Sequence, residues 1–598
     1  MAVLLGRAEL SSLSDEATGA RQLANRALSL VSGSGEWPLQ SFYANLKLAE
    51  LSLPDTEAAE LHLDDARPFL EEMSLPQLRF GFDECLGRVR SLQGRRREAE
   101  VLFERAIEEI ERVRGTVMQD SMRAVFLRDK SSVYKELLKL KLESGDAPAA
   151  FEVAERAKSR SLMDLLNGIS DAAFVFGDAA SEERLGVLQA DLSAVYNMML
   201  GGQDESEGAP PAPDLRGRAV ELEEEIGRLR LRAGASPSTE RDVFVSLDGY
   251  GADLPGDTVL LAYHVVGEEV IAFVSTPKDV RVMRGLGEVR EIRDLLRRLD
   301  SQWDRFRSGR AFSERQARML EKSTRRILAA LYDALVGPLE PLLEDAFSEV
   351  EAATSVATNG APRLAVVPHG PLHQAPFHAF FDGEGYLLER FEVSYAPSAA
   401  VFTSCQERRS GGIGEVMIAG VSDALIPAAR EEALAVSELF PDARPLLDEH
   451  ASLAAVSEAI SGRSVVHLAC HGMFRSDNSM FSGLKLHDGW MLASDVMKLE
   501  LDGAIVALSA CESGRNVVVG GDEILGLTRA FLGAKAATLL VSLWIVSDDT
   551  TASLMRRWYE KLLAGKPPTT ALRESQLATM RDHPHPYYWS PFIIVGGR

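Results

Sequence analysis

The sequence predicts an α + α/β fold: an N-terminal helical array, a helical hairpin and a C-terminal α/β domain with a mainly parallel sheet. Three observations lead to this prediction. Up to residue 165, apolar residues recur at helical spacing. Between 166 and 240, two heptad-like stretches flank a Gly/Pro/acid-rich insert, and from 241 short apolar runs alternate with helical patterns. We therefore expect a repeat domain at 1–165, a hairpin linker at 166–240 and an α/β domain at 241–598.

The composition is typical of a soluble globular protein. Of the 598 residues, 46% are hydrophobic and 26% are charged. The net charge of −24 repels a phosphate backbone, so we expect no direct binding of nucleic acid. No apolar run reaches the roughly 18 residues of a membrane span. The N-terminus lacks the order of a signal peptide, and the 4 cysteines make no disulfide framework. These features predict a cytoplasmic protein with free thiols and no membrane partner.

Within the first domain, a pattern of small residues predicts closely packed helical pairs. An alanine, a residue four positions on and an alanine three further on recur at Ala59/Leu63/Ala66, Ala99/Phe103/Ala106 and Ala150/Ala154/Ala157. The segment 86–106 resembles a tetratricopeptide (TPR) repeat. The first alanines are 40 and 51 residues apart (59 to 99 and 99 to 150), so the repeats are degenerate. A generic helical bundle is the alternative to a stacked array.

The linker is expected to form a helical hairpin. Residues 183–200 and 215–231 have heptad-like patterns, and the insert 201–213 between them is rich in Gly, Pro and acids. An exposed insert of this kind is a candidate for self-cleavage, and a passive linker is the alternative.

The α/β domain is predicted from continuous apolar runs separated by helical segments. Such runs are typical of parallel strands whose two faces are both covered. The region is long enough for one sheet or for two related halves. The predicted strands are residues 258–263, 270–274, 363–367, 415–419, 464–469, 504–509, 537–543 and 592–595.

Two of these strands end in residues that could perform chemistry. One runs into His471 and Gly472, and the other runs into Cys511. Ligands bind beyond the carboxyl ends of strands in an open parallel sheet, so we expect His471 and Cys511 to lie close together. A thiolate is a nucleophile and an adjacent imidazole can take its proton. The N–H groups of Gly472 and Cys511 are candidate donors to an oxyanion.

Other interpretations of these residues stay open. A cysteine that ends an apolar strand is often a small buried hydrophobe, and a histidine there is often structural. No sequence feature identifies a group that orients His471, for which a backbone carbonyl would suffice. His467, Cys470 and His471 have the spacing of metal ligands on a helix, but on a strand Cys470 points away from the two histidines. We expect no metal site.

The remaining histidines are expected to be structural. His369, His373 and His378 follow a predicted strand in a Pro/Gly-containing segment, and His583 and His585 suggest a surface loop. The glycine-rich stretch 411–414 lacks the lysine and hydroxyl residue of a phosphate-binding loop. The sequence therefore predicts no cofactor.

From about residue 331 onward, the chain resembles the CHAT family of caspase-like cysteine peptidases, which often follow TPR arrays. The resemblance is carried, in order, by residues 364–377, 428–433, 467–472, 508–514 with 521–532, 541–544 and 588–592. It implies a caspase-like fold at 331–598, with His471 as general base, Cys511 as nucleophile, and Gly472 and Cys511 as oxyanion donors. By position, residues 241–330 look like the pseudo-protease half of larger relatives.

The substrate pocket departs from the pattern of separases, which are distant relatives. In separases an acidic residue after a Leu-Trp pair receives an arginine of the substrate, whereas Ile545 occupies that place here. An isoleucine does not neutralise a guanidinium, so we expect an uncharged residue before the cleaved bond. The candidate pocket residues are Glu512, Asp522, Glu523, Ile545 and Asp548.

The resemblance implies an endopeptidase that cleaves a protein substrate and is latent until an activator protein binds the array. In this family such enzymes are associated with antiviral defence and programmed cell death, and some act on gasdermin-like proteins or other defence effectors. Two other functions stay open: a non-catalytic TPR and caspase-like scaffold, and a hydrolase of small amides.

Overall fold

The computed structural model describes most of the chain. The described residues are 4, 7, 17–31, 37–73, 76–115, 131–158, 162–163, 166, 179–201, 215–232, 254–308, 310–353, 360–408, 412–424, 426–473, 481–509, 517–519, 523–544 and 548–597. Contacts divide the chain into two compact units, residues 1–157 and 158–598. Each unit is described by itself.

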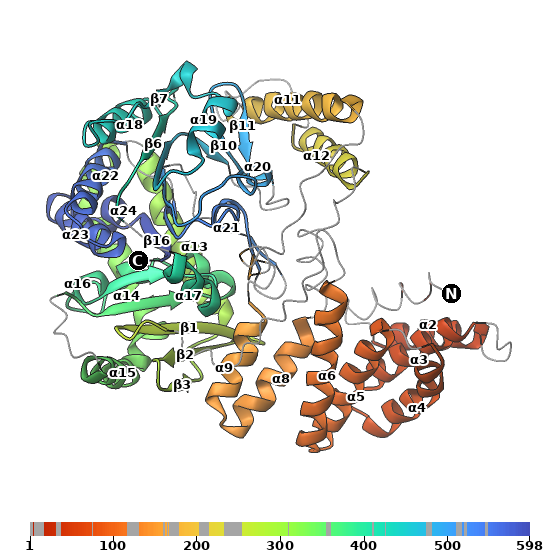
Figure 1. Cartoon of the computed structure of the whole chain (residues 1–598). Coiled ribbons are helices and arrows are strands. Elements are labelled where there is room, and N and C mark those ends of the chain that lie inside the picture. The colour runs from red at the N-terminus through yellow and green to blue at the C-terminus, as the bar shows by residue number, and fades with distance from the viewer. Residues whose placement is uncertain are drawn as a thin grey trace. The chain divides into compact units, whose positions relative to one another are not determined.

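The first unit is helical, as predicted, and its consecutive helices pack as hairpins (Figure 1). Gly94 and Gly145 take positive φ angles of 75° and 77° at two of the joints, where a residue with a Cβ would be strained. Asp146 then caps the next helix by accepting the N–H of Ala149 at 3.1 Å. The helices are α2 (Ala17–Val31), α3 (Pro38–Ser52), α4 (Thr56–Met73), α5 (Pro76–Leu92), α6 (Arg96–Gly115), α8 (Ser131–Ser144) and α9 (Ala147–Arg156).

The repeated small residues explain the close approach of these helices. Ala99, Phe103 and Ala106 of α6 are fully buried. Gly87 of α5 faces them, and a Cβ at this glycine would lie 2.6 Å from the Phe103 ring. The side chains at this spacing therefore set the distance between the two helices, which is the packing expected of a stacked array.

The predicted hairpin forms two helices of the second unit, α11 (Ala179–Gly201) and α12 (Leu215–Arg232), which pack along each other. The Tyr196 hydroxyl donates a buried hydrogen bond of 2.7 Å to Glu223 across this pair. Except for Gly201, the insert predicted at 201–213 lies outside the described residues.

A single 11-stranded sheet forms the centre of the second unit, in the order β3-β2-β1-β4-β5-β16-β15-β12-β8-β6-β7. Every apolar run predicted as a strand is one of its strands, and the predicted fold class is confirmed. The strands are β1 (Thr258–Val266), β2 (Glu269–Ser275), β3 (Val280–Met283), β4 (Arg363–Val367), β5 (Glu392–Tyr395), β6 (Val416–Gly420), β7 (Leu446–Leu447), β8 (Val465–Ala469), β12 (Ile505–Ser509), β15 (Thr538–Ser542) and β16 (Phe592–Gly596).

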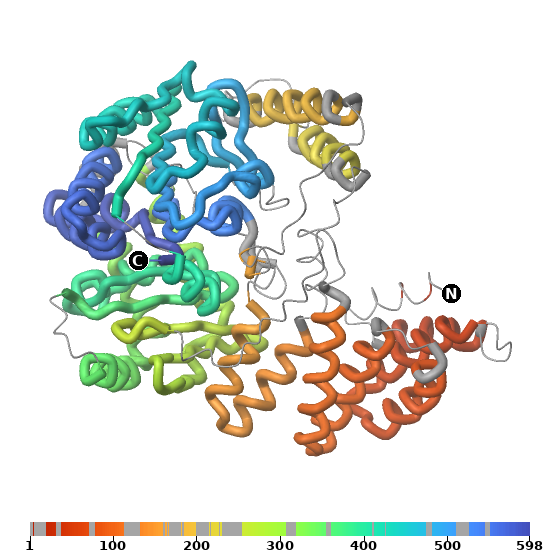
Figure 2. Tube along the Cα trace, viewed as in Figure 1, coloured from red at the N-terminus to blue at the C-terminus, as the bar shows by residue number. Residues whose placement is uncertain are grey.

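Apart from β2 and β3, which pair antiparallel at one side, the sheet consists of two sets of parallel strands that run in opposite directions. Strand β16 pairs parallel with β5 on one side and antiparallel with β15 on the other. It therefore joins the set β1-β4-β5 to the set β15-β12-β8-β6, and in Figure 2 the C-terminal end lies between the two. The carboxyl ends of the two sets consequently lie at opposite edges of the sheet.

Both faces of the sheet are buried. Neighbouring residues of β8 belong to different clusters, since Val465 packs with α18, α22 and α23 while Val466 packs in the larger cluster on the other face. The longer helices are α13 (Val289–Asp304), α14 (Arg310–Leu335), α15 (Glu340–Ala353), α17 (Ala399–Arg408), α18 (Ala429–Ser437), α19 (Leu453–Ile460), α21 (Leu527–Gly533), α22 (Asp548–Leu563) and α23 (Pro568–Asp582). The short helices are η1 (Arg305–Ser308), η2 (Gly337–Leu339), η3 (Gly370–Gln374), η4 (Phe377–Ala379), α16 (Leu387–Arg390), η5 (Asp448–His450), α20 (Ala493–Val496) and α24 (Pro586–Trp589).

A small antiparallel sheet, β11-β10-β9, connects the helical hairpin to the main sheet. Its strands are β9 (Gly472–Met473), β10 (Gly483–Lys485) and β11 (Trp490–Leu492), and a separate pair is formed by β13 (Val517–Val519) and β14 (Glu523–Leu525). Tyr196 of α11 meets Trp490 edge to face at 5.9 Å. One apolar cluster contains Leu188, Leu192, Val195, Tyr196, Ala219, Leu222, Ile226, Phe481, Trp490 and Leu492. Among the described residues, no helix has both the length and the apolar character needed to cross a membrane.

Substitution of Gly87 by alanine tests the packing of the array. The added methyl group collides with the buried Phe103 ring, so we expect Gly87→Ala to lower the free energy of unfolding by about 1–3 kcal/mol. The matched control is Gly186→Ala in α11, where a Cβ meets nothing within 4 Å. This control should keep or slightly raise stability, because alanine favours helix. Urea denaturation of the full chain measures both, and equal stability of the two variants would contradict the packing described.

Candidate active site

His471 lies just beyond the carboxyl end of β8, a central strand of the sheet. Strand β8 pairs parallel with β6 on one side and with β12 on the other. The side chain of His471 is 10% exposed. Because the three strands run in the same direction, the segments that follow them emerge at one edge of the sheet, where His471 lies.

A carboxylate engages this imidazole. His471 Nε2 donates to Asp423, whose Oδ1 and Oδ2 lie 2.9 and 3.0 Å away. Asp423 follows β6 by three residues and also accepts the N–H of Ile426 at 3.3 Å. From the sequence alone, a backbone carbonyl was the expected partner of the imidazole. The available signal was the position of Asp423 just after a predicted strand, at the edge where His471 was expected.

A lysine binds the same carboxylate. Lys485 Nζ donates to Asp423 Oδ2 at 3.1 Å, and the backbone N–H of Lys485 donates to the His471 carbonyl at 2.8 Å. Strand β10 therefore holds both the main chain of His471 and the partner of its side chain.

Behind Asp423, a second acid fixes the loop. Asp448 Oδ1 accepts the N–H and the hydroxyl of Ser422 at 3.0 and 2.8 Å, and Oδ2 pairs with Arg430 at 2.5 Å. Burial alone would raise the pKa of Asp448, but these hydrogen bonds outweigh it and hold the pKa below its ordinary value. The loop that carries Asp423 is thereby tied to the start of α18.

The expected nucleophile, Cys511, lies outside the described residues, as do Glu512, Asp522 and Ile545. The register Ser509↔Ala469 places the end of β12 beside the end of β8. Glu523 is the first residue of β14 and Asp548 the first residue of α22.

Comparison with known families identifies this part of the chain. Residues 325–597 match the model of the CHAT domain. The C-terminal region carries a CHAT domain. The resemblance seen in the sequence is therefore confirmed, and His471, Gly472 and Asp423 all lie within the matched residues.

Two curated relatives are named for their repeats. Tetratricopeptide repeat protein 28 of Homo sapiens is 28% identical over 332 residues, and that of Mus musculus is 27% identical over 332 residues. Each alignment covers 45% of this chain and 13% of the relative, so the chain spans a small part of their length. Two structures of the Saccharomyces cerevisiae separase–securin complex match with TM-scores of 0.45 and 0.43, at 11% and 10% identity. Both matches cover 100% of this chain and 53% of that chain.

The other histidines of the CHAT domain lie away from His471. His467 is fully buried on the α18/α22 face, where its Nδ1 lies 3.2 Å from the Tyr559 hydroxyl and its Nε2 lies 3.4 Å from Glu432. His369 and His373 follow β4, at the opposite edge of the sheet. Among the described residues, no group of three or more acidic, histidine or cysteine side chains is arranged to hold a metal ion.

Two histidines of the CHAT domain are buried and neutral. His378 Nε2 donates to the Ser590 carbonyl at 2.9 Å, and burial lowers the pKa of His378 to about 4. Burial likewise lowers the pKa of His585 to about 4. The prediction of a surface loop was wrong for His585, because its ring packs against Phe306 at a tilt and its Nδ1 accepts the N–H of Tyr587 at the start of α24.

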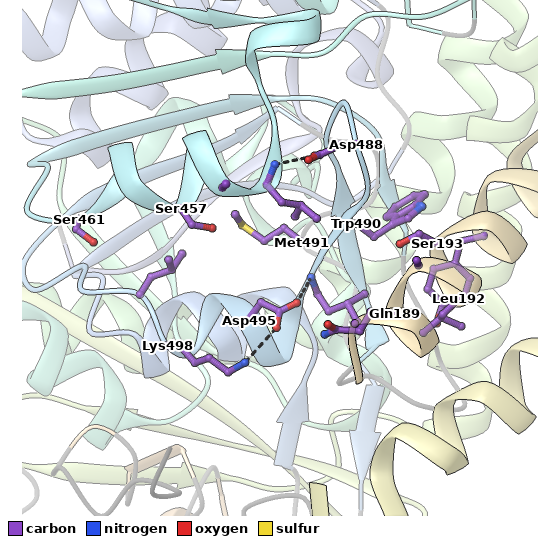
Figure 3. Close-up of a pocket in the computed structure, with 17 residues that line it drawn as sticks. Gln189, Leu192, Ser193, Ser457, Ser461, Asp488, Trp490, Met491, Asp495 and Lys498 are labelled. Carbon is purple, nitrogen blue, oxygen red and sulfur yellow. Dashed lines mark hydrogen bonds and ion pairs between the residues drawn. The ribbon is translucent and has the colours of Figure 1, made fainter. Parts of the chain in front are cut away.

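A cavity of about 660 Å³ lies among other described residues of the same unit. It is bounded by α11 on one side and by α19, β11 and α20 on the other (Figure 3). Its charged groups are engaged locally: Asp488 accepts the N–H of Leu453 at 2.7 Å, and Asp495 pairs with Lys498 at 3.2 Å. His471 and Asp423 do not line it.

The buried neutral histidines predict a stability that depends on pH. Their folded pKa of about 4 lies below the ordinary 6.5, so the unfolded chain binds more protons between these values. The stabilising contribution is present above pH 6.5 and is lost as the pH falls toward 4, by about 3 kcal/mol per histidine. His378→Gln should flatten this dependence, whereas His487→Gln, at an exposed site, should leave it unchanged. Denaturant unfolding at several pH values measures the slope, and equal slopes for both variants would refute the assignment.

Proposed function

We propose that the CHAT domain is a cysteine endopeptidase in which His471 and Cys511 cleave a peptide bond of a protein substrate. The observation that carries the proposal is the imidazole held by Asp423 at the edge of the sheet. Strand β12 ends beside it, two residues before Cys511. A histidine oriented by a carboxylate, next to a strand that leads into a cysteine, is the arrangement that activates a thiol nucleophile.

Each group has a defined role in this proposal. His471 takes the thiol proton through Nδ1, the nitrogen that Asp423 does not engage, and returns it to the leaving amine. Asp423 fixes the tautomer and stabilises the imidazolium that forms. The N–H groups of Gly472 and Cys511 bind the oxyanion, and the missing Cβ of Gly472 leaves room for the substrate carbonyl.

The choice of substrate and partner rests on the resemblance to the CHAT family. We propose a protein substrate with an uncharged residue before the cleaved bond, because Ile545 follows Leu543 and Trp544 where separases have an acid. The helical array would bind an activator protein that releases a latent enzyme. A place in cytoplasmic antiviral defence, with a gasdermin-like or similar effector as substrate, belongs to the same proposal.

A non-catalytic scaffold is the second candidate. It is favoured by the curated relatives, whose names refer to TPR repeats and to no reaction. A scaffold has no need of an imidazole bound by a carboxylate at the open edge of a sheet, so the chemistry of Cys511 separates the two functions.

Digestion of a proteome-derived peptide library tests the dyad. We expect cleavage by the wild-type chain and none by Cys511→Ala or His471→Ala, as read by mass spectrometry. Cleavage that persists in Cys511→Ala would overturn the assignment. If no variant cleaves, alkylation with iodoacetamide decides. An activated Cys511 reacts well below the ordinary thiol pKa of about 8.5 and depends on His471, whereas a scaffold cysteine does neither.

The other thiols do not confuse this readout. Cys85, Cys405 and Cys470 are buried, and burial raises the pKa of Cys405 to about 12. Alkylation near neutral pH should therefore report on Cys511.

Replacement of Asp423 tests its positioning role. Asp423→Asn keeps the size of the side chain but removes its charge, so the imidazole loses its preferred tautomer. We expect kcat to fall by about 10²–10⁴ with a smaller change in KM. Asp495→Asn is the matched control, since Asp495 also pairs with a lysine but contacts neither His471 nor Asp423. Equal activity of the two variants would contradict a role for Asp423.

A further inference from the structure

We infer that Lys485 is a positioning residue for His471: its ammonium group shares the Asp423 carboxylate with the imidazole and keeps the imidazole from holding a proton too strongly. The electrostatic part of this inference stands on the geometry alone. Its meaning for catalysis rests on the proposed peptidase function.

The three groups meet at one carboxylate. Asp423 Oδ2 lies 3.0 Å from His471 Nε2 and 3.1 Å from Lys485 Nζ. The side chains of Asp423 and Lys485 are 32% and 25% exposed, so solvent screens them only in part. One negative charge thus serves two potential cations.

The lysine is held in place by its main chain. Its N–H donates to the His471 carbonyl at 2.8 Å, and Lys485 pairs directly with Trp490 across β10 and β11. Trp490 in turn packs against Tyr196 of the helical hairpin. The main chain of Lys485 therefore cannot move away from His471 without breaking the small sheet, and the ammonium group starts from a fixed backbone position.

The charges explain why a cation is needed here. A carboxylate beside an imidazole favours the imidazolium form, whereas a general base must be free of its proton near neutral pH. The ammonium of Lys485 offsets the charge of Asp423 and so favours the neutral imidazole. Most surface ion pairs contribute little to stability. This carboxylate also binds the imidazole, so a change in its charge alters the electrostatic potential at His471.

The other described charged groups nearby are already engaged or face elsewhere. Asp448 and Arg430 bind each other, and Asp448 also accepts the hydroxyl of Ser422. On β8 itself, His467 and its partner Glu432 lie on the α18/α22 face. Among the described residues, Asp423 and Lys485 are thus the charged groups that contact the His471 side chain or its partner. The segment with Cys511 lies outside the described residues, so the experiment removes its thiol.

The test follows the His471 imidazole directly. The full chain with Cys511→Ala is labelled with ¹³C at histidine Cε1, the His471 signal is assigned with His471→Gln, and its titration is recorded by NMR. We expect Lys485→Met to move the midpoint of this titration upward by about one pH unit. Lys485→Arg, which retains the positive charge, should keep the midpoint at its wild-type value. Lys498→Met is the matched control. Lys498 also pairs with an aspartate, Asp495, at 3.2 Å, but this pair does not contact His471.

Each outcome decides the inference. An unchanged midpoint in Lys485→Met, or an equal shift in Lys498→Met, overturns it. A shift in Lys485→Met that Lys485→Arg does not reverse points to disrupted structure and also overturns it. If Lys485→Met fails to fold, as judged by its thermal midpoint and the other histidine signals, Lys485→Gln replaces it under the same criteria.

The titration also separates this inference from the proposed function, because the variant used cannot cleave. A shifted midpoint combined with a wild-type Cys511 whose alkylation does not depend on His471 would support the role of Lys485 and refute the peptidase. In an active enzyme, the pH dependence of kcat/KM should shift in Lys485→Met and stay unchanged in Lys498→Met. An unshifted profile in an active enzyme overturns the catalytic part alone.

Discussion

Burial of both faces of the central strands is the constraint on which the site depends. Strands β8 and β12 have helices on each side, so they can carry almost no polar side chain along their length. Polar groups are tolerated where the strands end and the chain meets solvent. Three parallel neighbours, β6, β8 and β12, end at the same edge, and this shared edge brings residues from distant parts of the sequence to His471.

At the carboxyl ends of these strands, interactions between charged groups, rather than apolar packing, hold the side chains in place. Asp423 accepts hydrogen bonds from both His471 and Lys485, so the two donors share one negative charge. Partial burial strengthens these interactions relative to the exposed ion pairs elsewhere in the chain. The hairpin packs on the same small sheet that holds Lys485, so a helical element from residue 179 onward contributes to the support of the site.

The strands could be predicted because continuous apolar runs follow directly from burial on both faces. His471 could be located for the same reason, since it follows such a run. Asp423 could not be connected to it, because 48 residues separate the two and pairing order is not encoded in local periodicity. The change of strand direction between β16 and β15 could not be predicted either, since an apolar run does not reveal whether its neighbours are parallel. His585 was misassigned because a Pro-rich pattern resembles a loop even where aromatic rings cover it.

The central place of β16 has a consequence for biosynthesis. Ribosomes release the chain from its N-terminus, so strands β1 to β15 emerge before residues 592–596 can pair. Until then, β5 and β15 each present an unpaired edge, and the two halves of the sheet are joined by no hydrogen-bonded strand. The nascent protein therefore depends on protection of these edges until residues 592–596 have emerged and paired.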